Sequence, residues 1–172
     1  MSKKRRSSSV AIDKLSVHFS ASHALILDHY EEGLHGHNYL VEMEIEGIPD
    51  NNDLIIDFIF LEKLLIQIVT EWDHYVLIPS KNKNMKMRKN KENMEIIYGE
   101  RFYSIPRAEI QLLSCTNVTT EALTRLLGEK IEEKLRKEIF WERIGAITIS
   151  IWETPIYWAS YTIKLNSGGS QK

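Results

Sequence analysis

The chain has 172 residues, 43% of them hydrophobic and 27% charged, which is the composition of an ordinary globular protein with a core. Its formal net charge of −2 gives no electrostatic reason to expect nucleic acid as a partner, and no apolar run approaches the roughly 20 residues of a membrane-spanning helix. The single cysteine, Cys115, excludes an intrachain disulfide, and the start of the chain lacks the apolar region of a signal peptide, so we expect a cytoplasmic protein.

Both ends of the chain are predicted to be disordered tails. Residues 1–10 are basic and rich in serine, and residues 167–172 contain a Ser-Gly-Gly-Ser sequence. The residues between them, 11–166, are expected to form a single domain.

The first strand is predicted over residues 12–23, where apolar and polar residues alternate. Its last residue is His23. The apolar positions of this alternation are Leu15, Val17, Phe19 and Ala21.

A second strand, predicted over 35–46, begins with a His-Gly-His triplet. Residues two apart in a strand point to the same side, so His35 and His37 should face one point. A turn between the strands would bring His23 across from this pair. Three neutral imidazoles with an open fourth position are the ligand set of a catalytic zinc site, whereas each histidine taken alone also fits a hydrogen-bonded strand residue.

Apolar residues at helical spacing predict two helices. The first should cover about 58–72, with Asp57 as its N-cap. The second should begin in the sequence from Asn117 and run for about twenty residues. Thr119 and Glu121 have the default roles of N-cap and first-turn acid in this helix.

Short strands and a loop are predicted around the second helix. The lysine-rich segment 81–91 is expected to be an exposed loop, followed by short strands over 95–103 and 109–114. Two further strands, 146–153 and 157–165, close the chain. This order predicts an α+β fold in which an antiparallel sheet carries both helices on one face.

Glu153 falls in register with three isoleucines on the expected buried face of its strand, where an unpaired carboxylate is strongly disfavoured. Either it lies in solvent at the strand end, or it accepts two adjacent N–H groups from the edge of a planar ligand.

Three other acidic residues are candidates for chemistry. Asp73 followed by His74 suits general acid–base catalysis, although acid-histidine pairs are also common helix caps. Glu31 and Glu32 precede the His-Gly-His triplet and would lie beside the proposed metal, unless they form an ordinary acidic turn.

Six motifs, taken in order, resemble the 6-pyruvoyltetrahydropterin synthase family, which includes the 6-carboxytetrahydropterin synthases. These motifs are Phe19-x-Ala21-x-His23, His35-Gly36-His37-Asn38-Tyr39, Asp57-Phe58-x-x-Leu61, Asp73-His74, Asn117-x-Thr119-x-Glu121 and Trp152-Glu153-Thr154. The resemblance implies a T-fold, in which a four-stranded antiparallel sheet packs two helices on one face and carries small extra strands. It also implies that three subunits join their sheets into a barrel and that two trimers stack as a homohexamer.

The resemblance further implies roles for the candidate residues, in sites that lie between subunits. The expected Zn²⁺ ligands are His23, His35 and His37. The expected contacts to a small-molecule pterin are Glu153, Thr119 and Glu121. The expected proton-transfer pair is Asp73 and His74.

The chain departs from typical members of this family, which carry a cysteine base a few residues before the His-Gly-His triplet. It is similar instead to a variant subgroup with a glutamate at the position of Glu32, while Glu31 stands where the usual cysteine would be, so either carboxylate is a candidate base. We therefore expect a zinc-dependent lyase that cleaves the side chain of 7,8-dihydroneopterin triphosphate, or of dihydroneopterin, to give 6-hydroxymethyl-7,8-dihydropterin. The alternatives are a 6-pyruvoyl- or 6-carboxytetrahydropterin synthase that eliminates triphosphate, and an oligomer that binds pterins or purines without catalysis.

Overall fold

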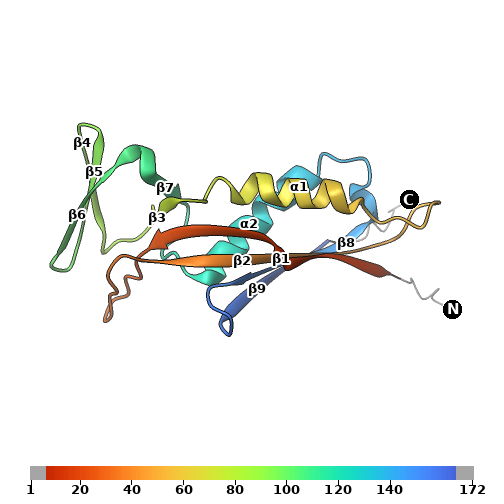
Figure 1. Ribbon diagram of the computed structural model, residues 1–172, viewed down its shortest axis with the longest axis horizontal. Helices are drawn as coiled ribbons and strands as arrows, with labels where there is room; N and C mark the ends of the chain where they lie inside the picture. The colour runs from red at the N-terminus through yellow and green to blue at the C-terminus, as the bar shows by residue number, and fades with distance from the viewer. Residues whose placement is uncertain (1–6, 166–172) are drawn as a thin grey trace, which may run out of the picture.

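The computed structural model describes residues 7–165, which form two sheets, two α-helices and two short 3₁₀ turns (Figure 1). The strands are β1 (Ser8–His23), β2 (His35–Gly47), β3 (Tyr75–Pro79), β4 (Lys86–Asn90), β5 (Asn93–Tyr98), β6 (Arg101–Pro106), β7 (Ile110–Leu113), β8 (Ile144–Trp152) and β9 (Trp158–Lys164). The helices are α1 (Phe58–Val69) and α2 (Thr120–Leu135). No helix among the described residues is long and apolar enough to cross a membrane.

The main sheet has the strand order β7-β3-β1-β2-β8-β9. Its β1, β2, β8 and β9 are antiparallel neighbours, as the sequence predicted. Two short strands extend it at one end, where β3 pairs in parallel with β1 at Ala21 and Ser22, and β7 pairs in parallel with β3. Both helices pack on the same face of this sheet (Figure 1). The predicted α+β T-fold architecture is therefore confirmed, with β3 as a strand that the sequence analysis did not assign.

The predicted alternation holds along β2, where Tyr39, Val41 and Met43 are completely buried. On β1 it fails at one residue, because Leu15 is 81% exposed. The register between β1 and β2 shifts between Ile12 and Val17, so a bulge turns Leu15 away from the core. A pattern of strict alternation cannot reveal such a shift in register.

Helix α1 begins as predicted after Asp57, whose carboxylate accepts the N–H of Phe60 at 2.8 Å. It ends at Val69 rather than near Trp72. After that residue the chain makes a tight turn that lets the Trp72 ring pack edge-on against Phe19, with ring centroids 5.7 Å apart.

Helix α2 also ends before its predicted limit. Its N-cap is Thr119, as expected, but it stops at Leu135. Ile139, which lies at the helical spacing of the apolar residues before it, is 99% exposed. Its neighbour Phe140 packs against Phe60 instead, because the chain leaves the helix and turns toward β8.

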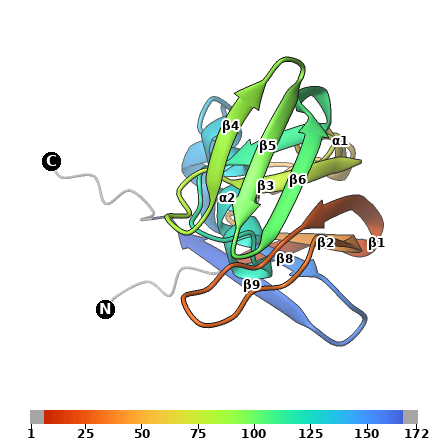
Figure 2. The ribbon, with the colours of Figure 1, turned by 90° about the vertical axis from the view of Figure 1, so that its left-hand side faces the viewer.

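The lysine-rich segment 81–91 is not a simple loop, which corrects the sequence-based expectation. Residues Lys86–Asn90 form β4, the first strand of a separate sheet with the order β4-β5-β6 (Figure 2). Met85 is buried, and with Met94, Ile96 and Tyr98 it belongs to a second hydrophobic core. The lysines of this segment are exposed, and their abundance favoured the prediction of a loop. Pairing with β5 makes part of the segment a strand instead.

The expected N-terminal tail is shorter than 1–10. Strand β1 starts at Ser8, which pairs with Gly47 of β2, so residues 8–10 belong to the sheet. The remaining tail residues, 1–6 and 167–172, lie outside the described residues.

Candidate active site

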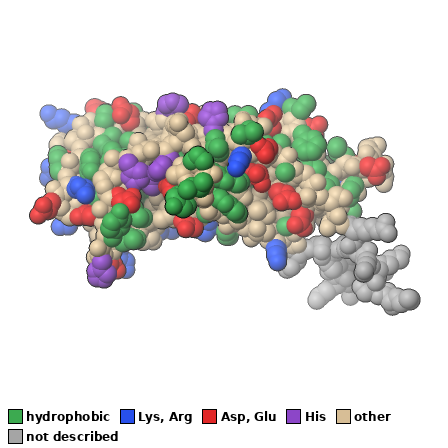
Figure 3. Space-filling model, turned by 60° about the horizontal axis from the view of Figure 1, so that its bottom comes forward, with side chains coloured by type: hydrophobic (Ala, Val, Ile, Leu, Met, Phe, Trp, Pro, Cys, Tyr) green, Lys and Arg blue, Asp and Glu red, His purple; other side chains and the backbone are tan. Residues whose placement is uncertain are grey.

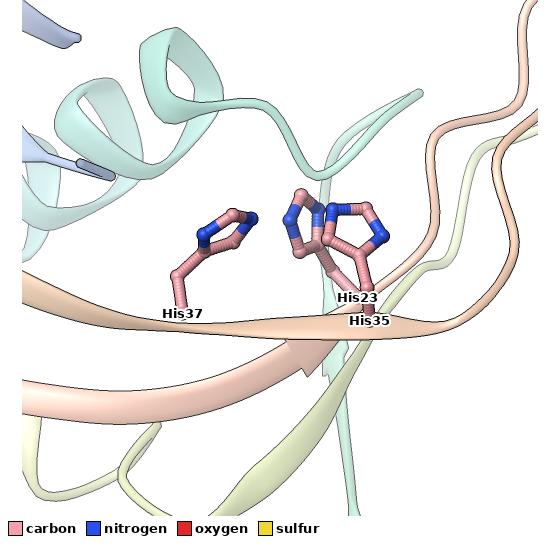
Figure 4. A group of neighbouring side chains, drawn as sticks. All are labelled: His23, His35 and His37. Carbon is pink, nitrogen blue, oxygen red and sulfur yellow. The ribbon is translucent and has the colours of Figure 1, made fainter.

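The three candidate metal ligands come together where β1 ends and β2 begins (Figure 4). His23 pairs with His35 and Ala21 pairs with His37 in the register of the two strands. One ring nitrogen from each histidine lies within 4.8 Å of the others. The sequence-predicted cluster therefore forms, from residues that a tight antiparallel pairing places side by side.

Backbone carbonyls fix the orientation of two of these rings. Nδ1 of His23 donates to the carbonyl oxygen of Val118 at 2.7 Å, and Nδ1 of His35 donates to that of Gly33 at 2.9 Å. A carbonyl can only accept, so the proton sits on Nδ1 and leaves the Nε2 lone pair free. Burial, followed by the nearby His35, lowers the pKa of His23, which favours the neutral ring that binds a metal.

Two of the ring nitrogens have no hydrogen-bond partner in the described part of the chain, which also fits a metal-binding role. Nε2 of His23 and Nε2 of His37 are buried without a hydrogen-bond partner among the described residues. Buried polar atoms are normally paired, and the nearest acceptor to both nitrogens is Oε1 of Glu153 at 3.5 Å, so these nitrogens are available to bind a ligand. Three neutral imidazoles are a donor set suited to zinc, which leaves a fourth position for substrate.

Glu153 lies just past the end of β8, in the turn where its N–H donates to the carbonyl oxygen of Tyr157. Its Oε1 is 3.5 Å from Nε2 of both His23 and His37. The pKa of Tyr39 is raised by burial and by the negative charge of this carboxylate. Glu153 is thus at a strand end, yet it faces the histidines rather than open solvent.

A cavity of about 620 Å³ opens over the histidines. Thr119 and Glu121, from the start of α2, line one side of it, and Glu32 lines another. Histidine side chains gather beside a hydrophobic patch on this face of the molecule (Figure 3). The sequence-predicted contacts to substrate therefore share one cavity with the candidate metal ligands.

The cavity also has an apolar wall that sequence reasoning missed. It is formed by Ile156, Tyr157 and Trp158, which follow Glu153 in the turn and at the start of β9. The signal in the sequence was three large apolar residues in succession, and the structure shows all three to be exposed.

Glu31 and Glu32 occupy different environments, which separates the two candidate bases. Oε2 of Glu32 is 3.6 Å from Nε2 of His35, and its Oε1 accepts a hydrogen bond from the Tyr30 hydroxyl at 2.9 Å. The Glu31 carboxylate instead packs against Gly99, where an added Cβ would lie only 2.2 Å from it, and it borders a separate cavity. Of the two candidate bases, Glu32 is the one that lies beside the histidines.

Asp73 and His74 form a hydrogen-bonded pair, but not in this cavity. Oδ2 of Asp73 is 2.9 Å from Nδ1 of His74, and its Oδ1 accepts the N–H of Ser20 at 2.8 Å. Burial raises the pKa of Asp73, but these two hydrogen bonds outweigh it and hold the pKa below its ordinary value. His74 is 81% exposed and borders a second cavity of about 360 Å³, together with Ser20 and Asn38 of the outer face of β1 and β2.

The pair is thus separated by the sheet from the histidine cluster of its own chain. Ser20 and Asn38 alternate along the strands with the residues that face the candidate metal site. A single chain does not bring the predicted proton-transfer pair and the predicted metal ligands together.

Comparison with known proteins decides the family. A sequence model of the family described as 6-pyruvoyl tetrahydropterin synthase matches residues 13–164. The chain belongs to this family. Members of the 6-pyruvoyl tetrahydropterin synthase family are pterin enzymes of the lyase type, which agrees with a histidine cluster at the floor of a cavity.

Two curated relatives are provisionally named 6-carboxy-5,6,7,8-tetrahydropterin synthases. The protein from Pyrococcus horikoshii is 33% identical, and the alignment covers 88% of this chain and 90% of the relative. The protein from Pyrococcus abyssi is 31% identical over the same shares of the two chains.

Solved structures support the same assignment. The 6-pyruvoyl tetrahydropterin synthase of Plasmodium falciparum superimposes with a TM-score of 0.85 at 26% identity, covering 94% of this chain and all of that one. The Plasmodium vivax protein gives a TM-score of 0.88 at 19% identity, with the same coverage. The fold of the family is therefore present across nearly the whole chain.

Proposed function

We propose that this family member is a zinc-dependent lyase that cleaves the side chain of 7,8-dihydroneopterin triphosphate to give 6-hydroxymethyl-7,8-dihydropterin. The observation that carries the proposal is the position of Glu32, whose carboxylate lies 3.6 Å from His35 in the cavity. The only thiol, that of Cys115, is buried at 4% exposure, does not line the cavity, and has its pKa raised by burial. A carboxylate is therefore the available base.

His23, His35 and His37 are the residues that would hold the zinc ion. When bound, zinc would lower the pKa of the substrate's side-chain hydroxyls and orient them. The protein itself contributes three imidazole rings that line the cavity, two of which are fixed in orientation by backbone carbonyls.

Glu153 would anchor the flat ring of the pterin. A carboxylate with two free oxygens can accept two parallel N–H groups from the pyrimidine edge, as it does from a guanidinium. The Thr119 hydroxyl accepts the N–H of Ala122 and keeps its own proton to donate to the same edge. Glu121, two residues further on, also lines the cavity and would add an acceptor.

Glu32 would remove the proton from the hydroxyl on the second side-chain carbon. The bond between the first and second carbons then breaks, the second becomes an aldehyde, and the electron pair passes into the C=N system of the ring. Protonation of the first carbon completes the hydroxymethyl product, and the remaining two-carbon aldehyde keeps the triphosphate. This sequence is a retro-aldol cleavage with general base catalysis.

Asp73 and His74 would supply that proton from a neighbouring subunit. Two edges of the main sheet support such an assembly, because β3 covers β1 only at Ala21 and Ser22 and β9 ends the sheet on the other side. Long open edges favour pairing with another copy. We infer a homohexamer built from two trimers, with each site shared between chains.

The test is product analysis with zinc-loaded protein and 7,8-dihydroneopterin triphosphate. The expected product is 6-hydroxymethyl-7,8-dihydropterin together with the phosphorylated two-carbon aldehyde. Accumulation of the pyruvoyl compound alone, with release of triphosphate, would overturn the proposal. The names of the Pyrococcus relatives favour a second candidate, a 6-carboxytetrahydropterin synthase, and the same assay would reveal its product.

A further inference from the structure

The sheet of β4, β5 and β6 contacts the candidate active site at the backbone on either side of Gly33. The Tyr98 hydroxyl, at the end of β5, donates to the carbonyl oxygen of Glu32 at 3.1 Å. The Tyr103 hydroxyl, on β6, accepts the N–H of Leu34 at 3.3 Å. The two phenols therefore hold one peptide acceptor and one peptide donor of the segment that carries the candidate base.

Tyr98 and Tyr103 form a stacked pair. Their ring centroids are 5.8 Å apart with an angle of 19° between the planes, and their hydroxyl oxygens are 3.4 Å apart. Tyr98 is only 2% exposed and packs in the second hydrophobic core with Met94 and Ile96. Burial raises the pKa of Tyr98, so its hydroxyl keeps the proton that it donates.

The segment that they hold orients two groups of the site at once. It carries the Glu32 side chain, and the Gly33 carbonyl between the two tyrosine contacts accepts from Nδ1 of His35 at 2.9 Å. On its other side the segment is tied to the end of β1, because the Glu32 N–H donates to the carbonyl oxygen of Leu25 at 2.8 Å. A shift of this backbone would move the base and turn the His35 ring together.

We propose that Tyr98 and Tyr103 are positioning residues, which hold Glu32 and His35 in the geometry needed for proton transfer. The sheet of β4, β5 and β6 is the scaffold of this pair. The inference rests on the proposed function, because it takes Glu32 as the base. A displacement of about 1 Å at a reacting group can cost about 100-fold in rate, so two hydrogen bonds to its backbone matter even though neither tyrosine touches the substrate.

The experiment compares Tyr98→Phe, Tyr103→Phe and the double variant, which keep the stacked rings and remove the hydroxyls. Tyr161→Phe on β9, away from this segment, is the matched control. We expect kcat to fall about tenfold in each single variant and up to about 100-fold in the double variant, with KM changed by less than about threefold. The control should keep the wild-type kcat.

Amide hydrogen exchange of the metal-free proteins gives a readout that does not depend on turnover. Peptides covering residues 25–34 should exchange about tenfold faster in the double variant, while those from α1 and α2 stay protected. An unchanged kcat in the double variant, or exchange that rises equally throughout the molecule, would overturn the positioning role. A wild-type protein without any turnover would instead refute the proposed function itself.

Discussion

Two adjacent glutamates illustrate how much depends on the direction of a single side chain. Glu31 pairs with Ile26 in an isolated β-bridge, and in such an extended segment neighbouring side chains point to opposite sides. Glu32 is therefore turned to the histidines and Glu31 to Gly99. The sequence left the choice of base open because it does not show on which side each residue falls.

The first prediction follows from this difference. Glu32→Ala should lower kcat by about 10²–10⁴-fold, the usual contribution of a general base. Glu31→Ala should keep a kcat close to the wild-type value, and both variants should retain the zinc content of the wild type. Steady-state kinetics on the zinc-loaded proteins decide the matter, and an equal loss in the two variants would contradict the assignment.

Asp73 gives a prediction about stability and pH. Its pKa is below its ordinary value of 3.8 in the native state, so below pH 3.8 the unfolded chain takes up a proton that the native chain does not. The stability that Asp73 contributes is therefore complete above pH 3.8 and is lost as the pH falls through the native pKa. Thermal unfolding should show Asp73→Asn less stable than the wild type at pH 6, with a smaller difference at pH 3. A difference that is constant with pH would contradict this.

At the scale of elements, β4, β5 and β6 form a sheet beside the main one (Figure 2), and their buried side chains belong to the second hydrophobic core. Ile96→Ala should lower the free energy of unfolding by about 2–5 kcal/mol, because it leaves a cavity among buried side chains. Ile97→Ala, on the solvent side of the same strand, should change it by less than about 1 kcal/mol. Guanidinium unfolding curves measure both values, and similar losses would mean that the second core is not packed as described.

The elements show which features of this fold the sequence could predict. Four long strands, two helix caps and the histidine cluster rest on local patterns, and all of them are found. The bulge beside Leu15 depends on the register with β2, and β4 depends on a hairpin with β5, so alternation and composition misjudged them. The side of the sheet on which Asp73 and His74 lie likewise depends on where β3 pairs with β1, and no local sequence pattern predicts that.

At the scale of the whole molecule, the separation of the Asp73–His74 pair from the histidine cluster predicts that activity needs more than one chain. His35→Ala and His74→Ala proteins should each be inactive. When the two are co-expressed in equal amounts, mixed oligomers should recover about a quarter of the wild-type turnover. About one site in four then combines an intact His35 from one chain with an intact His74 from its neighbour. Sedimentation should give a mass of six chains of 20.1 kDa. Mixed oligomers without activity would place the pair outside the reaction.

Gly36 lies between the two candidate ligands of β2, where there is little room for a side chain. An added methyl group there would lie 3.1 Å from both the carbonyl oxygen of Ala21 and the hydroxyl oxygen of Ser22. These atoms belong to β1, the strand that carries His23. A larger residue would therefore push β1 and β2 apart and change the spacing of the three imidazoles. The absence of a side chain at Gly36 therefore lets β1 and β2 approach closely enough to hold the three imidazoles together.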